Sequence, residues 1–218
     1  MSNPFDFTAS LKLTDLPSEV RHQLDRCLLD LVGVGIGGAT TPLSAIIRDH
    51  AVAQFGGSQA LWFDGRKASA AGIALAAGMT IDALDGHDGY NPAKGHVGCG
   101  LVPGLTALAV EGGASGAEFL SAVAAGYELG SRLGPALHAS VPDYHTSGAW
   151  IAVAVAVAGA RLLGLDPEQT RHAAGIAEYH GPRSQMMRCI DHPTMLKDGS
   201  GWGAMAGVSA AYLAAEGF

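Results

Sequence analysis

Stretches rich in Ala and Gly dominate this chain and favour a fold of closely packed helices. Of the 218 residues, 31 are Gly and 48% are hydrophobic. Small side chains let helix backbones approach one another, but Gly costs about 1 kcal/mol relative to Ala inside a helix, so packing must offset that loss. We therefore expect helices that are mostly buried in one sizeable core.

Helix start and stop signals divide the chain into about eight helices. No stretch alternates polar and apolar residues as a half-buried strand does. The sequence thus predicts an all-α, multi-helix fold with a single helical domain over residues 1–218. The expected helices that we can place span about residues 16–37, 41–56, 67–84, 115–132, 146–163, 166–179 and 201–216, with capping boxes at Ser115 to Glu118 and Asp166 to Gln169 and a polar loop over residues 181–200.

Charge and composition argue against several classes of partner. A net charge of -7 without a Lys/Arg cluster argues against nucleic acid and against anionic membranes. The longest uncharged helical run, Ser147 to Ala160, is shorter than the roughly 20 residues of a membrane span. Residues 1–6 have neither the basic leader nor the apolar segment of a secretory signal. We expect a soluble, cytoplasmic protein with reduced cysteines.

One block, residues 82–96, concentrates titratable side chains in a chain that is only 15% charged. It holds three Asp, two His, a Lys and a Tyr between two apolar segments, which indicates chemistry or ligand binding. Asp82 and Asp85 are three residues apart at an expected helix end. There they could share a face as a carboxylate pair with one raised pKa, or one could bond loop amides.

Three further polar islands, at residues 143–147, 183–188 and 191–200, interrupt the apolar background. Two of them place His or Lys at a helix N-terminus, where free backbone N–H groups and the helix dipole favour a carboxylate ligand. Arg183 and Arg188 suit bidentate carboxylate binding and equally suit ion pairs within the loop. Together the islands predict a pocket for an anionic small molecule.

A metal site is the alternative for the 82–96 block. Asp85, His87, Asp88 and His96 are residue types that suit zinc or iron, but their spacing matches no HExxH or paired Cys/His arrangement. We expect no metal, and an unchanged rate after chelation would remove this alternative.

Taken in order, the motifs of the chain resemble the MmgE/PrpD family over nearly its whole length. The specificity lies in the ordered set, because each motif alone is weak. Two features depart from the family: the chain is longer between His87 and His96, and Val97 stands where Pro is more usual. The motifs are Asp82-x-x-Asp85-Gly-His87, Gly95-His96-Val-Gly98, Gly116-Ala-Glu118-Phe119-Leu120, Ala125-Gly126-Tyr127-Glu128, Tyr144-His145-Thr146-Ser147, Leu163-Gly164-Leu165-Asp166, Leu196-Lys197-Asp198-Gly199 and Ala214-Ala215-Glu216-Gly217-Phe218.

The resemblance implies an activity. The family includes 2-methylcitrate dehydratase, cis-aconitate decarboxylase and iminodisuccinate epimerase, which act without metal or cofactor on di- or tricarboxylates. Their shared step is proton transfer at a carbon next to a carboxylate, which needs a positioned base and groups that stabilise negative charge. The resemblance places the catalytic Asp at Asp82 or Asp85, the two His at His96 and His145, and the Lys at Lys197, with His87, Arg183 and Lys197 as candidates for binding the substrate.

The resemblance also implies a missing part. Family members are longer and continue past Gly217-Phe218 into a smaller α/β lid domain, which we expect to be absent here. The chain is then a lyase or isomerase in its own right, a non-catalytic or half-site helical subunit that pairs with a lid-bearing chain, or a truncated piece. In each case we expect a homodimer or another chain to cover part of the helical surface.

Overall fold

The computed structural model describes residues 3–191, 193 and 195–218, and within them it confirms the all-α prediction. The described part contains nine α-helices, with a single antiparallel pair of two-residue strands, β1 (Gln59–Ala60) and β2 (Lys67–Ala68). The helices are α1 (Pro4–Ser10), α2 (Ser18–Gly38), α3 (Pro42–Gln54), α4 (Ala70–Asp82), α5 (Gly98–Gly112), α6 (Gly116–Ser140), α7 (Gly148–Leu162), α8 (Pro167–His180) and α9 (Ser200–Ala215), with short 3-10 turns at Leu13–Asp15, Asn91–Ala93 and Met186–Cys189.

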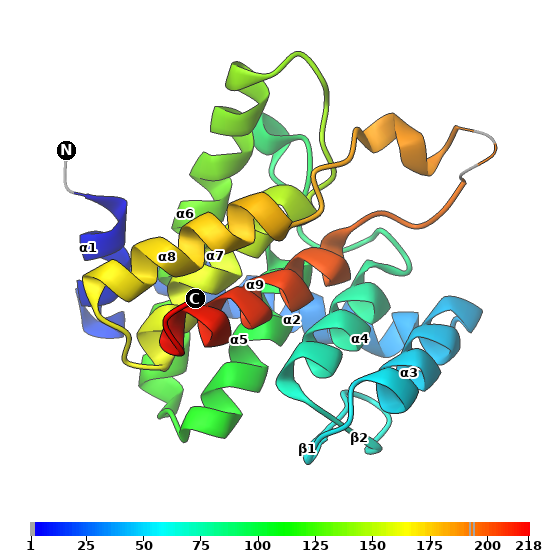
Figure 1. Ribbon diagram of the computed structural model, residues 1–218, viewed down its shortest axis with the longest axis horizontal. Coiled ribbons are helices and arrows are strands. Elements are labelled where there is room, and N and C mark those ends of the chain that lie inside the picture. Colours follow the sequence, from blue (N-terminus) through cyan, green and yellow to red (C-terminus); the bar gives the residue numbers. More distant parts are fainter. Residues whose placement is uncertain (1–2, 192, 194) are drawn as a thin grey trace.

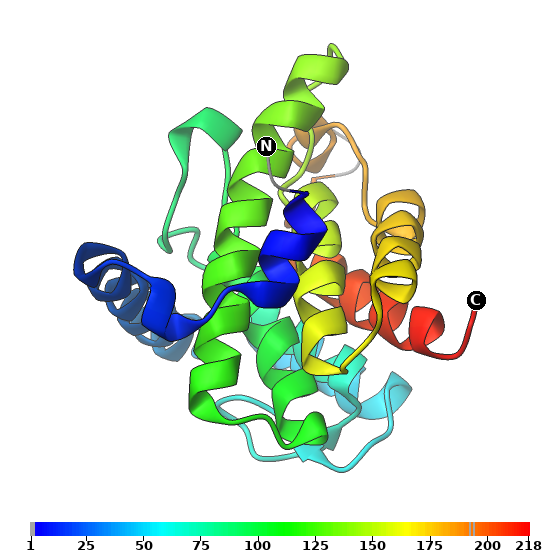
Figure 2. The same ribbon diagram turned by 90° about the vertical axis from the view of Figure 1, so that its left-hand side faces the viewer.

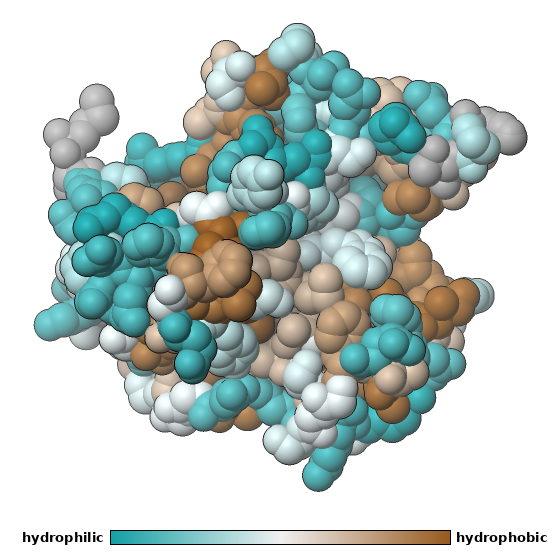
Figure 3. All heavy atoms as spheres, viewed as in Figure 1, coloured by the Kyte–Doolittle hydropathy of each residue, from teal (hydrophilic) through white to brown (hydrophobic). Residues whose placement is uncertain are grey.

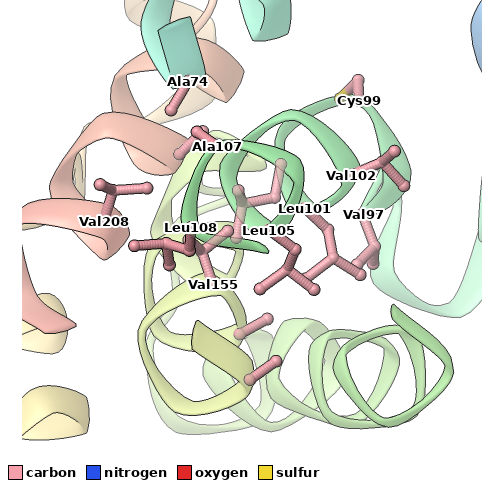
Figure 4. Packing of buried hydrophobic residues seen from close by; sticks show 14 of the residues in the cluster. Ala74, Val97, Cys99, Leu101, Val102, Leu105, Ala107, Leu108, Val155 and Val208 are labelled. Carbon is pink, nitrogen blue, oxygen red and sulfur yellow. The ribbon is translucent and has the colours of Figure 1, made fainter. Parts of the chain in front are cut away.

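Four apolar helices, α4, α5, α7 and α9, form the centre of the molecule. Helix α9 packs against α7 and α4, and α5 packs against α4 and α7; Figure 1 shows α9 crossing the middle of the view with α8 beside it. In Figure 4, Leu105 and Leu108 of α5 lie near Val155 of α7, with Val208 of α9 beside them. The two Leu side chains are fully buried. For these four helices the expectation of burial is confirmed.

Glycine permits the closest of these helix contacts. A Cβ on Gly203 of α9 would lie 2.4 Å from the carbonyl oxygen of Gly148 in α7. A Cβ on Gly201 would lie 2.5 Å from the carbonyl oxygen of Leu75 in α4. No side chain fits at such distances, so α9 approaches both helices only because Gly stands at these positions. The packing brings the segment that precedes α9 against the start of α7.

The outer helices are less buried than composition predicts. Leu24 and Leu31 of α2 are buried, whereas Val32 is 44% exposed and Leu29 is 75% exposed. Figure 2 shows α2, in dark blue, at the edge of the molecule. Within the described residues no single helix is long and apolar enough to cross a membrane; α2 and α3 reach that length only together, across a bend of 94°.

Several predicted helix bounds are wrong. The helix expected from residue 67 begins at Ala70, because Lys67 and Ala68 pair as β2. The helix expected to end near residue 132 continues to Ser140 through Pro135. Helices α1 and α5 were not predicted, and α5 carries Pro103 in its interior, where proline normally argues against a helix.

One of the two predicted capping boxes forms. Asp166 and Gln169 exchange both bonds of the box at the start of α8. At the start of α6, Ser115 accepts from the backbone of Glu118, but the Glu118 carboxylate pairs with Arg161 at 2.6 Å instead of returning to the cap. A long-range ion pair thus replaces the second half of that box.

Candidate functional site

The predicted pair of carboxylates divides between two environments at the end of α4. Asp82 is the last residue of the helix and its side chain is fully buried. Asp85 has a φ of 50°, and 66% of its side chain is exposed. A non-Gly residue in this left-handed region turns the chain sharply. Beyond the turn, His87 is buried, with Nε2 at 3.5 Å from Oδ1 of Asp82.

The loop after His87 folds on itself and returns His96 to the same place. Tyr90 and Gly95 pair as an antiparallel bridge, with the Tyr90 N–H donating to the Gly95 carbonyl at 2.9 Å. The ring of His96 then packs against that of His87, with centroids 4.0 Å apart and the ring planes tilted by 42°. Its Nε2 lies 3.4 Å from Oδ1 of Asp85.

Hydrogen bonds from several elements hold His96. Its backbone N–H donates to Oγ of Ser147 at 3.1 Å, and its carbonyl accepts from Nε1 of Trp150 in α7 at 2.8 Å. Its Nδ1 lies 2.6 Å from the carbonyl oxygen of Asp88. Because a carbonyl only accepts, Nδ1 carries a proton, so Nε2 is the nitrogen that keeps the lone pair whenever the ring is neutral.

Lys197 reaches the same place from the segment before α9. Its Nζ lies 3.6 Å from Oδ1 of Asp82 and 3.8 Å from Oδ1 of Asp85. The structure therefore brings together five of the residues that the sequence singled out. We call them the central cluster: Asp82, Asp85, His87, His96 and Lys197.

Burial sets the protonation of the cluster's inner half. It raises the pKa of Asp82 to about 8, the Asp198 carboxylate adds to this rise, and Lys197 opposes it. Burial also lowers the pKa of His87 to about 4, with His96 as the next cause. Near pH 7 the cluster thus contains a carboxyl that largely keeps its proton and a neutral imidazole. Among the described protein atoms, the Asp82 oxygens and the His87 ring nitrogens find no hydrogen-bond partner, so they keep bonding capacity for a ligand.

His145 lies outside the central cluster and is linked to it through its chain neighbours Thr146 and Ser147. It is buried just before α7. Its ring Nδ1 lies 2.7 Å from the Asp143 carbonyl oxygen, and its backbone N–H donates to Nε2 of His138. Thr146 accepts from the N–H of Gly199 at 3.0 Å, and Ser147 holds His96. The 143–147 island therefore joins both loops of the site, although none of the contacts found within the described chain joins His145 directly to the cluster.

Arg183 points elsewhere. Its guanidinium pairs with Glu178 and lines a different cavity, beside Trp150 and Leu137. The sequence left open carboxylate binding or an ion pair within the loop for this residue; the structure displays an ion pair, but with Glu178 of α8 as the partner.

A cavity of about 290 Å³ opens next to Lys197. Its polar lining includes Thr146, Arg188 and Asp198, and Trp202 contributes an apolar wall. Figure 3 shows the surface hollowed where the 181–199 segment, orange in Figure 1, projects beyond the helices. The volume lies at the small end of the range for ligand pockets.

Among the residues that the structure describes, two sets of side chains could hold a metal ion by distance alone. The ligand atoms of Asp85, His87 and His96 lie within 4.8 Å of one another, as do those of Asp82, His87 and Cys99. Asp88, which the sequence alternative included, belongs to neither set. The ammonium of Lys197, at 3.8 Å from Asp85, would repel a cation in the first set.

The sequence did not identify several residues that shape this site. Asp198 perturbs Asp82, and Ser147 and Trp150 fix the backbone of His96. Asp198 and Ser147 lie in quoted motifs, whereas nothing local marked Trp150. His192, in the third polar island, and the first two residues lie outside the described residues.

Comparison with known proteins agrees with the ordered motifs. The MmgE/PrpD N-terminal domain matches residues 5–218. The cis-aconitate decarboxylase-like protein oryM of Aspergillus oryzae is 28% identical over 186 residues, which are 79% of this chain and 38% of that protein. Cis-aconitate decarboxylase of Aspergillus terreus is 27% identical over 181 residues, 78% of this chain and 37% of that protein. The matched region thus spans less than two fifths of these relatives, and within that region the chain belongs to the MmgE/PrpD family.

Proposed function

We propose that this chain carries the proton-transfer centre of a lyase or isomerase that acts on a small di- or tricarboxylate. One observation supports the proposal most strongly: two carboxyl groups and two imidazoles of residues 82–96 meet the ammonium of Lys197, which also lines a cavity of about 290 Å³. Removing a proton next to a carboxylate needs a base and a cation in this kind of arrangement.

The geometry supports a role for each group. His96 Nε2, which keeps its lone pair, is the proposed base that takes the α-proton. Lys197 holds a substrate carboxylate and stabilises the negative charge that develops on it. Asp82, kept protonated by burial, is placed to return a proton, and Asp85, 3.4 Å from Nε2 of His96, is placed to pair with the imidazolium that forms when Nε2 takes the proton. His145 supplies a second imidazole once substrate bridges the gap.

The fate of the carbanion defines the reaction. Loss of a β-hydroxyl from the carbanion gives dehydration, and proton return to its opposite face gives epimerisation. In decarboxylation the departing carbon dioxide itself leaves the electron pair on carbon, and the site delivers a proton to the carbanion that results. The names of the Aspergillus relatives favour cis-aconitate as the first substrate to test.

We also propose that another chain covers part of the outer face, as a second copy of this one or as a lid-bearing partner. Leu29 and Ile36 of α2 and Ile46 of α3 are each more than half exposed, which is apolar surface that such a contact would bury. Light scattering coupled to gel filtration measures the oligomeric state, and a Leu29→Glu, Ile46→Glu variant should shift a dimer toward the monomer.

Proton NMR in D2O tests the proposed chemistry. The purified chain is incubated with cis-aconitate, 2-methylcitrate, citrate or iminodisuccinate, beside His96→Ala and Lys197→Ala variants. Exposed His172→Ala and Lys67→Ala serve as matched controls. The proposal predicts loss of the signal next to a carboxylate, or new vinylic signals, in the wild type and in the controls only. Silence from a folded wild-type chain across the panel would contradict it and favour a helical subunit that needs a partner.

A further inference from the structure

We propose that Asp88 and Tyr127 are a positioning pair that keeps the proton of His96 on Nδ1, so that Nε2 faces the substrate as an acceptor. The inference rests on the proposed role of His96 as the base. Neither side chain touches the central cluster directly in the contacts found; both act through the loop that carries His96.

The peptide carbonyl of Asp88 is the atom that selects the tautomer. It lies 2.6 Å from Nδ1 of His96, a distance that requires a proton between them. A neutral imidazole otherwise distributes its proton between its two nitrogens. If the carbonyl moves away, the proton can occupy Nε2, and the atom facing Asp85 becomes a donor that cannot accept a substrate proton.

Two helices hold Asp88, one through its backbone and one through its side chain. Its backbone N–H donates to Oδ2 of Asp30 on α2 at 2.9 Å. Its side-chain Oδ2 accepts from the hydroxyl of Tyr127 on α6 at 2.7 Å. With the bond to His96, contacts on the N–H, the carbonyl and the carboxylate fix both the position and the rotation of this one residue.

The pair occupies a place that the fold leaves open for it. A Cβ on Gly98, the first residue of α5, would lie 2.1 Å from the Tyr127 oxygen and 2.8 Å from Oδ1 of Asp88. The absence of that side chain lets the carboxylate reach the start of α5, where the helix dipole favours negative charge. Burial, together with the Asp88 charge, raises the pKa of Tyr127, so the phenol keeps its proton and remains a donor.

The Asp88 carboxylate is a costly group to place here unless it has a function. Burial raises its pKa against the opposing bond from Tyr127, and its Oδ1 has no hydrogen-bond partner within the described chain. An apolar residue would avoid this desolvation. What the carboxylate adds is a directional link from α6 to the carbonyl that binds His96.

The test reads the His96 tautomer and turnover separately. Long-range ¹H–¹⁵N NMR of chain labelled with ¹⁵N-histidine shows which nitrogen carries the proton, and His96→Gln assigns the signal. Tyr127→Phe and Asp88→Leu remove the link. Asp88→Asn keeps an acceptor for the Tyr127 hydroxyl, and Tyr179→Phe on exposed α8 is the matched control.

We expect the Nδ1–H form in the wild type, Tyr179→Phe and Asp88→Asn. In Tyr127→Phe and Asp88→Leu the proton should move toward Nε2, with kcat falling about tenfold and KM changing less than about twofold, because no substrate contact is lost. If Tyr127→Phe does not fold, Asp30→Ala, at the exposed end of the network, tests the same link and should also move the proton.

His96 that stays in the Nδ1–H form in folded Tyr127→Phe and Asp88→Leu overturns the proposal, whatever the turnover. A kcat loss equal in Asp88→Asn and Asp88→Leu, without a change of tautomer, also overturns it. The NMR readout needs no turnover, so an inactive chain with the expected tautomers would contradict the proposed function and leave the positioning pair supported.

Discussion

The two loops that build the central cluster are held very differently. The first arm, residues 82–96, begins with a buried side chain on α4 and ends with His96, whose backbone and ring are bonded to several elements. The second arm, residues 181–199, is joined to the body chiefly at residues 144–146: Thr146 donates to Ser184, Met186 donates to Tyr144, and Gly199 donates to Thr146.

The surfaces of the two arms differ in the same way. Several apolar side chains of the second arm are more than half exposed: Met187, Ile190, Met195 and Leu196. The side chains that we propose as acid and base are thus held in place by the first arm. The ammonium of Lys197 instead lies near the end of a segment whose apolar side chains are largely exposed. From this difference we propose that the first arm fixes the chemistry of the proposed reaction and that the second arm adapts to the carboxylates of its substrate.

The largest expected effect separates the arms by kinetics. His96→Ala should lower kcat by about 10²- to 10⁴-fold, the usual contribution of a positioned base. Lys197→Ala should raise KM as well as lower kcat, because it removes a carboxylate partner. Initial rates over a range of substrate concentrations, with His172→Ala and Lys67→Ala as controls, measure both. If His96→Ala raised KM and left kcat unchanged, the proposed difference between the two arms would be contradicted.

A second prediction concerns the pH dependence of stability in the first arm. The folded pKa of Asp82, about 8, lies above that of an ordinary Asp, so the folded chain binds the proton more tightly than the unfolded one. This contribution is fully present below the unfolded pKa of about 4 and is lost as pH rises toward 8. Asp82→Asn should therefore flatten the loss of stability between pH 5 and about 8.5, with a difference on the order of 1–3 kcal/mol.

Urea unfolding at a series of pH values measures this difference, with the exposed Asp6→Asn as control. Equal slopes in Asp82→Asn and wild type would show that Asp82 titrates normally in the folded chain.

A third prediction addresses the contact between the arms and the core. A Cβ on Gly148 would lie 2.2 Å from the carbonyl oxygen of Gly199, at the end of the second arm. Gly148→Ala should therefore destabilise the fold by about 1–3 kcal/mol through overpacking. Gly175→Ala, on the open side of α8, has free space and should instead stabilise it by up to about 1 kcal/mol. Thermal unfolding of both variants measures their Tm. Equal changes in Tm would contradict the close contact between Gly148 and Gly199.

The smallest effect is expected on the exposed face of the second arm. Met195→Ser and Ile190→Ser remove side chains that are 71% and 58% exposed. Each should change the free energy of unfolding by less than about 0.5 kcal/mol. A loss above 2 kcal/mol in urea titrations would show that this arm is held as firmly as the first.

Local signals in the sequence predicted most helices but not all. Asp166 with Pro167 marked the start of α8 because cap chemistry is local. Helix α5 was not predicted because Gly98, Gly100 and Pro103 are typical of loops. The helix forms because the tertiary packing of its Leu residues outweighs the low helix propensity of Gly and Pro.

Prediction of the site from the sequence has the same limit, because local signals do not reveal contacts between distant residues. The motifs selected Asp82, Asp85, His96 and Lys197, and the structure places all four in one cluster. Spacing could not distinguish the two Asp residues, because the difference arises from the burial of Asp82, to which the charge of Asp198, far along the chain, adds. The role of Tyr127 likewise depends on a contact across 39 residues, which no local pattern reveals.

The most direct test of the account asks whether both arms bind one ligand. Cis-aconitate is titrated into ¹⁵N-histidine-labelled chain while the His96 ring signals are followed, in the wild type, Lys197→Ala and Lys67→Ala. We predict a saturable shift of His96 in the wild type and in Lys67→Ala, and a Kd at least about tenfold weaker in Lys197→Ala. A His96 signal that does not move, or an equal Kd in Lys197→Ala, would contradict the account.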